Sequence, residues 1–291
     1  MATDSYKNPY KRVSADAFEA MQLDTGVLLT SFDFANPFDP PDNDDILATT
    51  TGGINPVCEP IYEDLGEDVD NVPNNMKEFV KLTGWNCSLS FTSIKFNAAN
   101  TKWALGAADE ADAPTGAPTG TKKIVLRADI ELSDFRDIYA AFPMANGGIF
   151  VVKLKNAVST GGMNIQSTKN GKGTNQVTLT GYVSIDAQDE MPMEFYHIPG
   201  LAKAIKVTSE AGATTGKTKI STNYTLRSGE SYVYEVGTAA EVVYYGDTTT
   251  GWTEWDGTSD ITAETGKKIT VVVSRDDKAV AAGNTTVTAK A

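Results

Sequence analysis

The stretch Trp85-Asn86-Cys87-Ser88-Leu89-Ser90-Phe91 places an apolar side chain at every second position. Alternation with a period of two is typical of a strand with one buried face, because successive side chains of a strand point to opposite sides. Similar strand-like patterns follow at residues 124–130, 149–154, 177–185 and 191–198. We therefore predict a mainly β protein whose strands pair antiparallel into a sandwich or barrel.

One segment has a different spacing. Phe135, Ile138, Tyr139 and Phe142 recur at intervals of three and four residues, and Ser133 can cap the segment. This spacing predicts a single α-helix over residues 132–142 that packs its apolar side chains on a sheet and ends at Pro143.

Residues 13–76 contain no lysine, arginine or histidine but carry fourteen carboxylates. Charge of a single sign over such a length folds poorly on itself, which favours a segment that meets another surface or repels a polyanion. Within it, residues 36–75 hold nine prolines and glycines and predict a long extended loop. A loop of this length in a compact domain is usually functional or ordered by a partner.

The last ninety or so residues differ in composition. They are rich in Thr, Gly and Ala, and short strand-like segments recur at residues 218–226, 231–236, 241–245, 268–274 and 285–290. This spacing predicts a small immunoglobulin-like sandwich. We therefore divide the chain into residues 1–200 and 201–291; the first part has a net charge of −12 (15 basic, 27 acidic residues) and the second of −1 (10 basic, 11 acidic).

Composition disfavours several classes of function. A net charge of −13 argues against DNA or an anionic membrane as a binding partner, although an acidic conduit could pass DNA without holding it. Residues 1–12 lack the apolar core of a secretory signal, and no apolar run of about 18 residues is long enough to span a bilayer. These features predict a protein made in a cytoplasm, where Cys58 and Cys87 act as small apolar residues more readily than as a disulfide.

Catalytic patterns are equally scarce. The single histidine, His197, has no nucleophile motif beside it, and no phosphate-binding glycine loop occurs. Residues 39–45 are acidic but lack the spacing of a calcium loop, so an interface or solvated loop is the favoured interpretation. We expect no enzyme activity, no cofactor and no metal; the alternative function is a carbohydrate-binding or adhesin protein whose aromatic side chains Trp252 and Trp255 contact sugar.

Six segments, taken in order, resemble the major tail proteins, or tail tube proteins, of long non-contractile-tailed bacteriophages. They are QLDTGVLL (22–29), TGGIN (51–55), LGEDVDNVPNN (65–75), LGAAD (105–109), SDF with IY (133–135, 138–139) and VSTGG (158–162). The resemblance covers about two thirds of the chain and ends near Tyr196, and it is carried by the order of the segments.

The resemblance implies a sandwich or barrel with one flanking helix, assembled as stacked hexameric rings into a virion tail tube through which DNA is ejected. The implied partners are further copies of this chain, tape-measure protein, and tail terminator and distal tail proteins, with DNA as passing cargo and no membrane. Residues 201–291 would then decorate the tube. On this view the acidic loop contacts a neighbouring subunit, and its interface candidates are Asp42, Asp44, Asp45, Glu67, Asp68 and Asp70.

Overall fold

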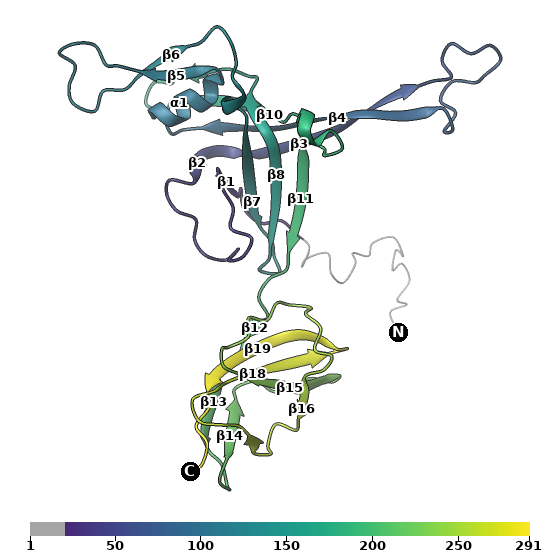
Figure 1. Ribbon diagram of the computed structural model, residues 1–291, viewed down its shortest axis with the longest axis vertical. Helices are drawn as coiled ribbons and strands as arrows, with labels where there is room; N and C mark the ends of the chain where they lie inside the picture. The colour runs from purple at the N-terminus through teal and green to yellow at the C-terminus, as the bar shows by residue number, and fades with distance from the viewer. Residues whose placement is uncertain (1–20) are drawn as a thin grey trace, which may run out of the picture. The chain divides into compact units, whose positions relative to one another are not determined.

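The computed structural model describes residues 21–291. Residues 1–12 and the first two of the fourteen carboxylates, Asp16 and Glu19, lie outside the described residues. The chain divides into two compact units (Figure 1). The first unit comprises residues 21–144 and 149–198, and the C-terminal unit comprises residues 145–148 and 199–291. Both are built mainly from antiparallel strands, as the alternating patterns predict.

The first unit contains one large branched sheet. Its strands are β1 (Val27–Leu29), β2 (Ile46–Ala48), β3 (Thr50–Asp64), β4 (Val80–Ser93), β7 (Arg136–Pro143), β8 (Ile149–Ser159), β9 (Asn164–Gln166), β10 (Thr174–Thr180) and β11 (Met193–Ile198). The main order is β2-β1-β7-β8-β10-β4-β3, with β11 on β8 and β9 on β10.

Strand β8 belongs to both halves of the branched sheet. Its first part pairs with β11 from Ile149 to Leu154, whereas its end pairs with β10 at Val158 and Ser159. The two halves of the sheet thereby face each other across a shared core. The buried side chains of that core include Leu28, Leu89, Ile138, Val152, Leu154 and Leu179. This arrangement is the sandwich that the strand pattern predicts.

The predicted helix over residues 132–142 is wrong. A 3-10 turn covers Leu132–Asp134, and β7 then runs between β1 and β8. Ile138, Ala140 and Phe142 point into the core with a period of two, while Phe135 and Tyr139 are half-buried. The apolar positions of this segment satisfy both periods, and pairing with two neighbouring strands selects the extended form.

The helix of the described chain is α1, Ala98–Leu105. Asn97 caps its first turn, where its side-chain oxygen accepts a hydrogen bond from the Asn100 N–H at 2.8 Å, and Gly106 ends it with a φ of 76°. Ser159 Oγ donates to the Ala104 carbonyl at 2.7 Å and ties the helix to β8. A hairpin of β5 (Ala108–Ala111) and β6 (Lys123–Leu126) follows α1 (Figure 1).

The predicted loop over residues 36–75 is wrong in its middle part, which is strand. Its first part, up to Asp45, and its last part, residues 65–75, are irregular; β2 and the 15-residue strand β3 lie between them. The prediction of a loop rested on glycine and proline residues that the strand accommodates. Gly52 and Gly53 adopt positive φ at a bulge of β3, and Pro56 and Pro60 lie on a strand with one free edge, where a missing N–H breaks no ladder.

The C-terminal unit is a sandwich of two sheets. The larger sheet has the order β12-β19-β18-β15-β16 and the smaller one β13-β14-β17. Their bounds are β12 Lys203–Ala204, β13 Val207–Ala211, β14 Lys217–Thr222, β15 Glu230–Gly237, β16 Thr253–Trp255, β17 Ile261–Thr262, β18 Lys268–Arg275 and β19 Lys278–Thr286. Ile220 of the smaller sheet and Val271 of the larger sheet share one buried cluster. The expected strand at 241–245 is replaced by a single bridge at Tyr244, and the last strand begins earlier than residue 285.

Candidate assembly surface

Strands β3 and β4 extend beyond the sheet as a two-stranded hairpin (Figure 1). Strand β10 accompanies β4 from Ser88 to Ser93, and the Gly181 N–H donates to the Cys87 carbonyl at 3.0 Å. Beyond that point β4 pairs with β3 alone. We call residues 59–86, which form this projecting part and its tip, the arm.

One face of the hairpin carries apolar side chains along its whole length. Directly opposed residues share a face, and every second pair returns to it. Within the body, Ile54–Phe91 and Pro56–Leu89 are such pairs, and Leu89 is fully buried. In the arm the same face continues with Tyr62 opposite Leu82.

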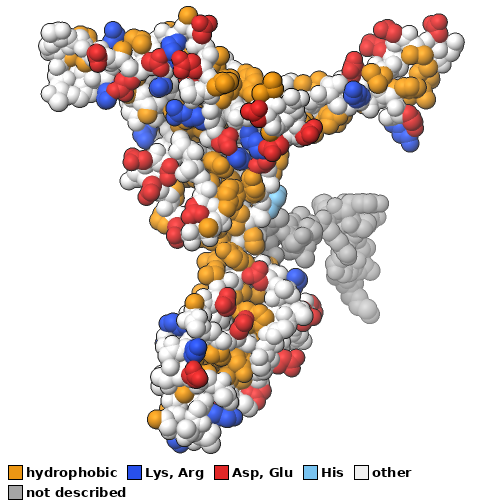
Figure 2. Space-filling model, in the orientation of Figure 1, with side chains coloured by type: hydrophobic (Ala, Val, Ile, Leu, Met, Phe, Trp, Pro, Cys, Tyr) orange, Lys and Arg blue, Asp and Glu red, His pale blue; other side chains and the backbone are white. Residues whose placement is uncertain are grey.

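This apolar face is uncovered in the arm. Tyr62 is 62% exposed, Leu82 45% and Val80 40%. Further exposed apolar side chains surround the tip, at Leu65, Val69, Met76 and Phe79. Figure 2 shows hydrophobic side chains along the arm, with acidic ones around its tip. An isolated two-stranded hairpin is only marginally stable in water, so an arm of this kind gains stability when a partner covers it.

The Asp64 carboxylate organises the tip. It accepts hydrogen bonds from the backbone N–H of Asn75 at 2.7 Å and of Gly66 at 2.9 Å. These hydrogen bonds hold the pKa of Asp64 below its ordinary value, and the bond from Asn75 has the largest effect. The Leu65 N–H donates to the Phe79 carbonyl at 3.0 Å and closes the hairpin. The tip is therefore an ordered turn.

The arm is strongly acidic, with seven carboxylates and two lysines and a net charge of −5. The predicted interface residues Glu67, Asp68 and Asp70 all lie at its tip and are exposed. Within residues 21–291 none of the three forms an ion pair. Their charges are thus available to a cationic or solvated partner surface.

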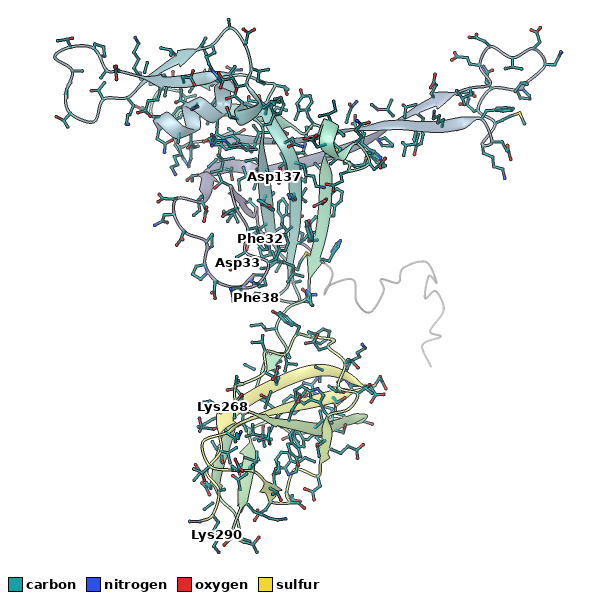
Figure 3. All side chains as sticks on the ribbon, in the orientation of Figure 1. Phe32, Asp33, Phe38, Asp137, Lys268 and Lys290 are labelled. Atoms are coloured by element: carbon teal, nitrogen blue, oxygen red, sulfur yellow. The ribbon has the colours of Figure 1, made fainter. Side chains whose placement is uncertain are left out.

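The other three predicted residues belong to a separate surface, the loop before β2. Asp42 and Asp44 are exposed there, whereas Asp45 is half-buried and its carbonyl accepts from the Thr30 N–H at 2.8 Å. Figure 3 labels Phe32, Asp33 and Phe38 of the same loop. The loop borders a pocket of about 440 Å³ that is also lined by Val27, Leu29 and Ile149. The structure therefore does not bring the six predicted acidic residues together.

No group of three or more His, Cys, Asp or Glu side chains in residues 21–291 is arranged to hold a metal ion. The carboxylate of Asp33 instead accepts hydrogen bonds from the Asn36 side chain at 2.9 Å and from the Ala35 N–H at 2.8 Å. These hydrogen bonds lower the pKa of Asp33, and the bond from the Asn36 side chain has the largest effect. No helix of the described chain is long and apolar enough to cross a bilayer.

The tryptophans of the C-terminal unit face inward. Trp255 is 7% exposed, its ring packs on Tyr232, and its indole N–H donates to the Ser259 carbonyl at 2.9 Å. Trp252 is half-buried against a cluster that includes Val233 and Val272. Stacking on a sugar requires an exposed ring face, so the buried Trp255 does not supply the expected contact.

Sequence reasoning missed an ion-pair cluster beside α1. Arg127 pairs with Glu131 at 2.7 Å and with Asp109 at 3.2 Å, and it also contacts Asp134, whose side chain is only 6% exposed. The Glu131 N–H also donates to the Asp134 carboxylate at 2.9 Å, and together these contacts fix the 3-10 turn that precedes β7. The i, i+4 spacing of Arg127 and Glu131 is the one signal of the cluster in the sequence.

Comparisons with known proteins add little to this geometry. No protein-family model matches the sequence, and no curated protein matches it. Among solved structures, domains 7, 8 and 9 of the S-layer protein SbsC match 38% of this chain at 24% identity, with a TM-score of 0.29. The chain spans 36% of the length of that structure, and a likeness at this level carries no argument about function.

Proposed function

We propose that this chain is a structural subunit of a bacteriophage tail tube that assembles with copies of itself into stacked, hexameric rings and conducts DNA. The observation that carries this proposal is the uncovered apolar face of the arm, with Tyr62 opposite Leu82. In an isolated chain this face stays in water, whereas in a polymer a neighbouring subunit buries it. The resemblance of the segments between residues 22 and 162 supports the same assignment.

The free edge of β3 supports assembly through strand pairing. No strand in residues 21–291 pairs with its outer side, and β3 is 15 residues long. Such an edge offers unpaired backbone groups to another chain. Pro56 and Pro60 each remove one donor from β3, which limits uncontrolled pairing.

The acidic character of residues 1–200 suits a conduit for DNA, since phosphates are repelled from carboxylates and slide without binding. On this proposal DNA is passing cargo, and tape-measure, tail terminator and distal tail proteins are the other partners. The C-terminal unit would decorate the tube as an immunoglobulin-like domain. The protein would then be located in the virion tail after assembly in the host cytoplasm.

The test is negative-stain electron microscopy, with mass determination, of the full chain over a concentration series. The wild type should form rings or hollow tubes, and the variant Tyr62→Ser/Leu82→Ser should stay dissociated at the same concentrations. Ile165→Ser is the matched control, because Ile165 is 56% exposed but lies on β9, outside the arm. A wild type that stays monomeric at every concentration while binding glycan would replace the proposal with the carbohydrate-binding alternative.

A further inference from the structure

Cys58 on β3 and Cys87 on β4 lie directly opposite each other at the base of the arm. Their sulfur atoms are 2.8 Å apart, and both residues are free thiols. Opposed residues of an antiparallel pair have Cα atoms about 4.5 to 5.5 Å apart, which falls inside the range that a disulfide spans. The backbone therefore already holds these two side chains in a position that a bond between them requires.

The two thiols differ in their surroundings. Cys87 is 1% exposed and belongs to the core of the first unit, whereas Cys58 is half-buried at the edge of that core. Burial, followed by the contact with Cys58, raises the pKa of the Cys87 thiol to about 12. A reagent in solution thus meets Cys58 first, and Cys87 reacts afterwards with the Cys58 sulfur of the mixed disulfide.

We propose that Cys58 and Cys87 form an oxidation site that closes into an intramolecular cross-strand disulfide when the protein meets a small disulfide such as oxidised glutathione. The Cys58 thiolate attacks one glutathione sulfur, forms a mixed disulfide and releases the first glutathione thiolate. The Cys87 sulfur then attacks the Cys58 sulfur and releases the second. The two protein protons end on the two glutathione thiols, so two protein thiols are oxidised and one glutathione disulfide is reduced.

The disulfide would constrain the two strands of the arm. Residues 59–86 all lie within the loop that it closes, and it stands where β10 ceases to support β4. A covalent link at this position fixes the register of the two arm strands even when their hydrogen bonds open. This inference concerns the isolated chain and does not depend on the proposed tail tube.

The experiment equilibrates the native full-length protein with oxidised glutathione, quenches it with iodoacetamide in denaturant and measures the intact mass. The wild type should lose two hydrogen masses and take up no alkyl group, whereas the reduced sample should take up two. Cys87→Ser should retain one glutathionyl group on Cys58, because no second thiol displaces it. Cys58→Ser should react at least tenfold more slowly under native conditions, because Cys87 is buried.

Limited proteolysis gives an independent readout. A cut anywhere within residues 59–86 yields two fragments, which should stay joined after oxidation and separate after reduction. This result would support the proposal even if one serine variant failed to fold. Stable glutathione adducts on the wild type, disulfide-linked dimers, or two alkylatable thiols after equilibration would overturn it.

Discussion

Tyr62 and Leu82 are paired across the arm, and both are exposed on the same face that is buried at Leu89 nearer the body. The hairpin thus extends its apolar face beyond the core that covers its base. Exposed side chains contribute little to the stability of a single chain. A surface that covered the arm would therefore bury apolar side chains that the single chain leaves exposed.

The first prediction separates folding from association. Tyr62→Ser/Leu82→Ser should change the unfolding free energy of the dissociated subunit by less than about 1 kcal/mol, because both side chains are already in water. Leu89→Ala should cost about 2–5 kcal/mol, because Leu89 is fully buried. Urea denaturation at a concentration below assembly measures both. A large loss in the arm variant would mean that the arm stabilises its own subunit.

The second prediction concerns the arm tip. Asp64→Ala should increase hydrogen exchange at the N–H groups of Gly66 and Asn75, which lose their shared acceptor. Glu63→Ala is the control, since Glu63 is exposed and adjacent in the chain. Unchanged exchange at both N–H groups would show that other contacts hold the tip.

The tip should also respond to acid. In the folded chain the pKa of the Asp64 carboxyl is lowered from its ordinary value of 3.8. The ionised carboxylate therefore contributes fully to the stability of the tip above that pH. The contribution is lost as the pH falls through the folded pKa. Protection of Gly66 and Asn75, corrected for intrinsic exchange, should be constant from about pH 5 to 7 and fall below about pH 4. Protection that fell near neutral pH would implicate another group.

The third prediction concerns a buried carboxylate of the C-terminal unit. The Glu230 side chain is 1% exposed, pairs with Arg275, and accepts from the Arg227 N–H at 2.8 Å and from Tyr224 Oη at 3.1 Å. Although burial opposes it, this set of donors holds the pKa of Glu230 below its ordinary value. Glu230→Ala should destabilise the unit by about 1–3 kcal/mol, while the exposed Glu235→Ala on the same strand should be neutral.

Thermal melts monitored in the C-terminal unit check this prediction. Because the folded pKa of Glu230 is lowered, its contribution is present above the unfolded value near 4.5 and is lost as the pH falls through the folded pKa. The difference between wild type and Glu230→Ala should therefore shrink in acid. A difference that grew in acid would contradict the assignment.

The fourth prediction compares two glycines with positive φ. A Cβ on Gly26 would lie 2.5 Å from the Ala141 carbonyl oxygen, whereas a Cβ on Gly52 would meet nothing within 4 Å. Gly52→Ala should cost about 1–2 kcal/mol from backbone conformation alone. Gly26→Ala should cost about 1–3 kcal/mol more, because β1 must move away from β7. Equal losses in urea denaturation would show that β1 adjusts freely.

The fifth prediction concerns independence of the units. The main core of the first unit is formed by residues between Leu28 and Met193. A chain that ends at Gly200 should therefore fold cooperatively and form the same polymer in electron micrographs. Loss of the polymer, with folding intact by circular dichroism, would reassign the C-terminal unit to assembly.

The sequence determined which segments are half-buried strands where only one period fits. Residues 85–91 alternate strictly, and Cys87, Leu89 and Phe91 are indeed buried on one face. Capping signals for α1 were also present at Asn97 and Gly106, but its short, weakly amphipathic sequence gives no apolar stripe to accompany them. These features are local, so neighbouring residues suffice to specify them.

Tertiary structure decided the rest. Residues 132–142 fit a helix or a strand by spacing, and hydrogen bonds from β1 and β8 on both sides settled the choice. The strands of the arm could not be predicted from a local sequence rich in glycine, proline and carboxylates. They are defined by pairing across a turn of about fifteen residues. The contact of Cys58 with Cys87, 29 positions apart, likewise depends on that register. Strand pairing joins residues distant in the chain, and no local pattern records which partner a strand will find.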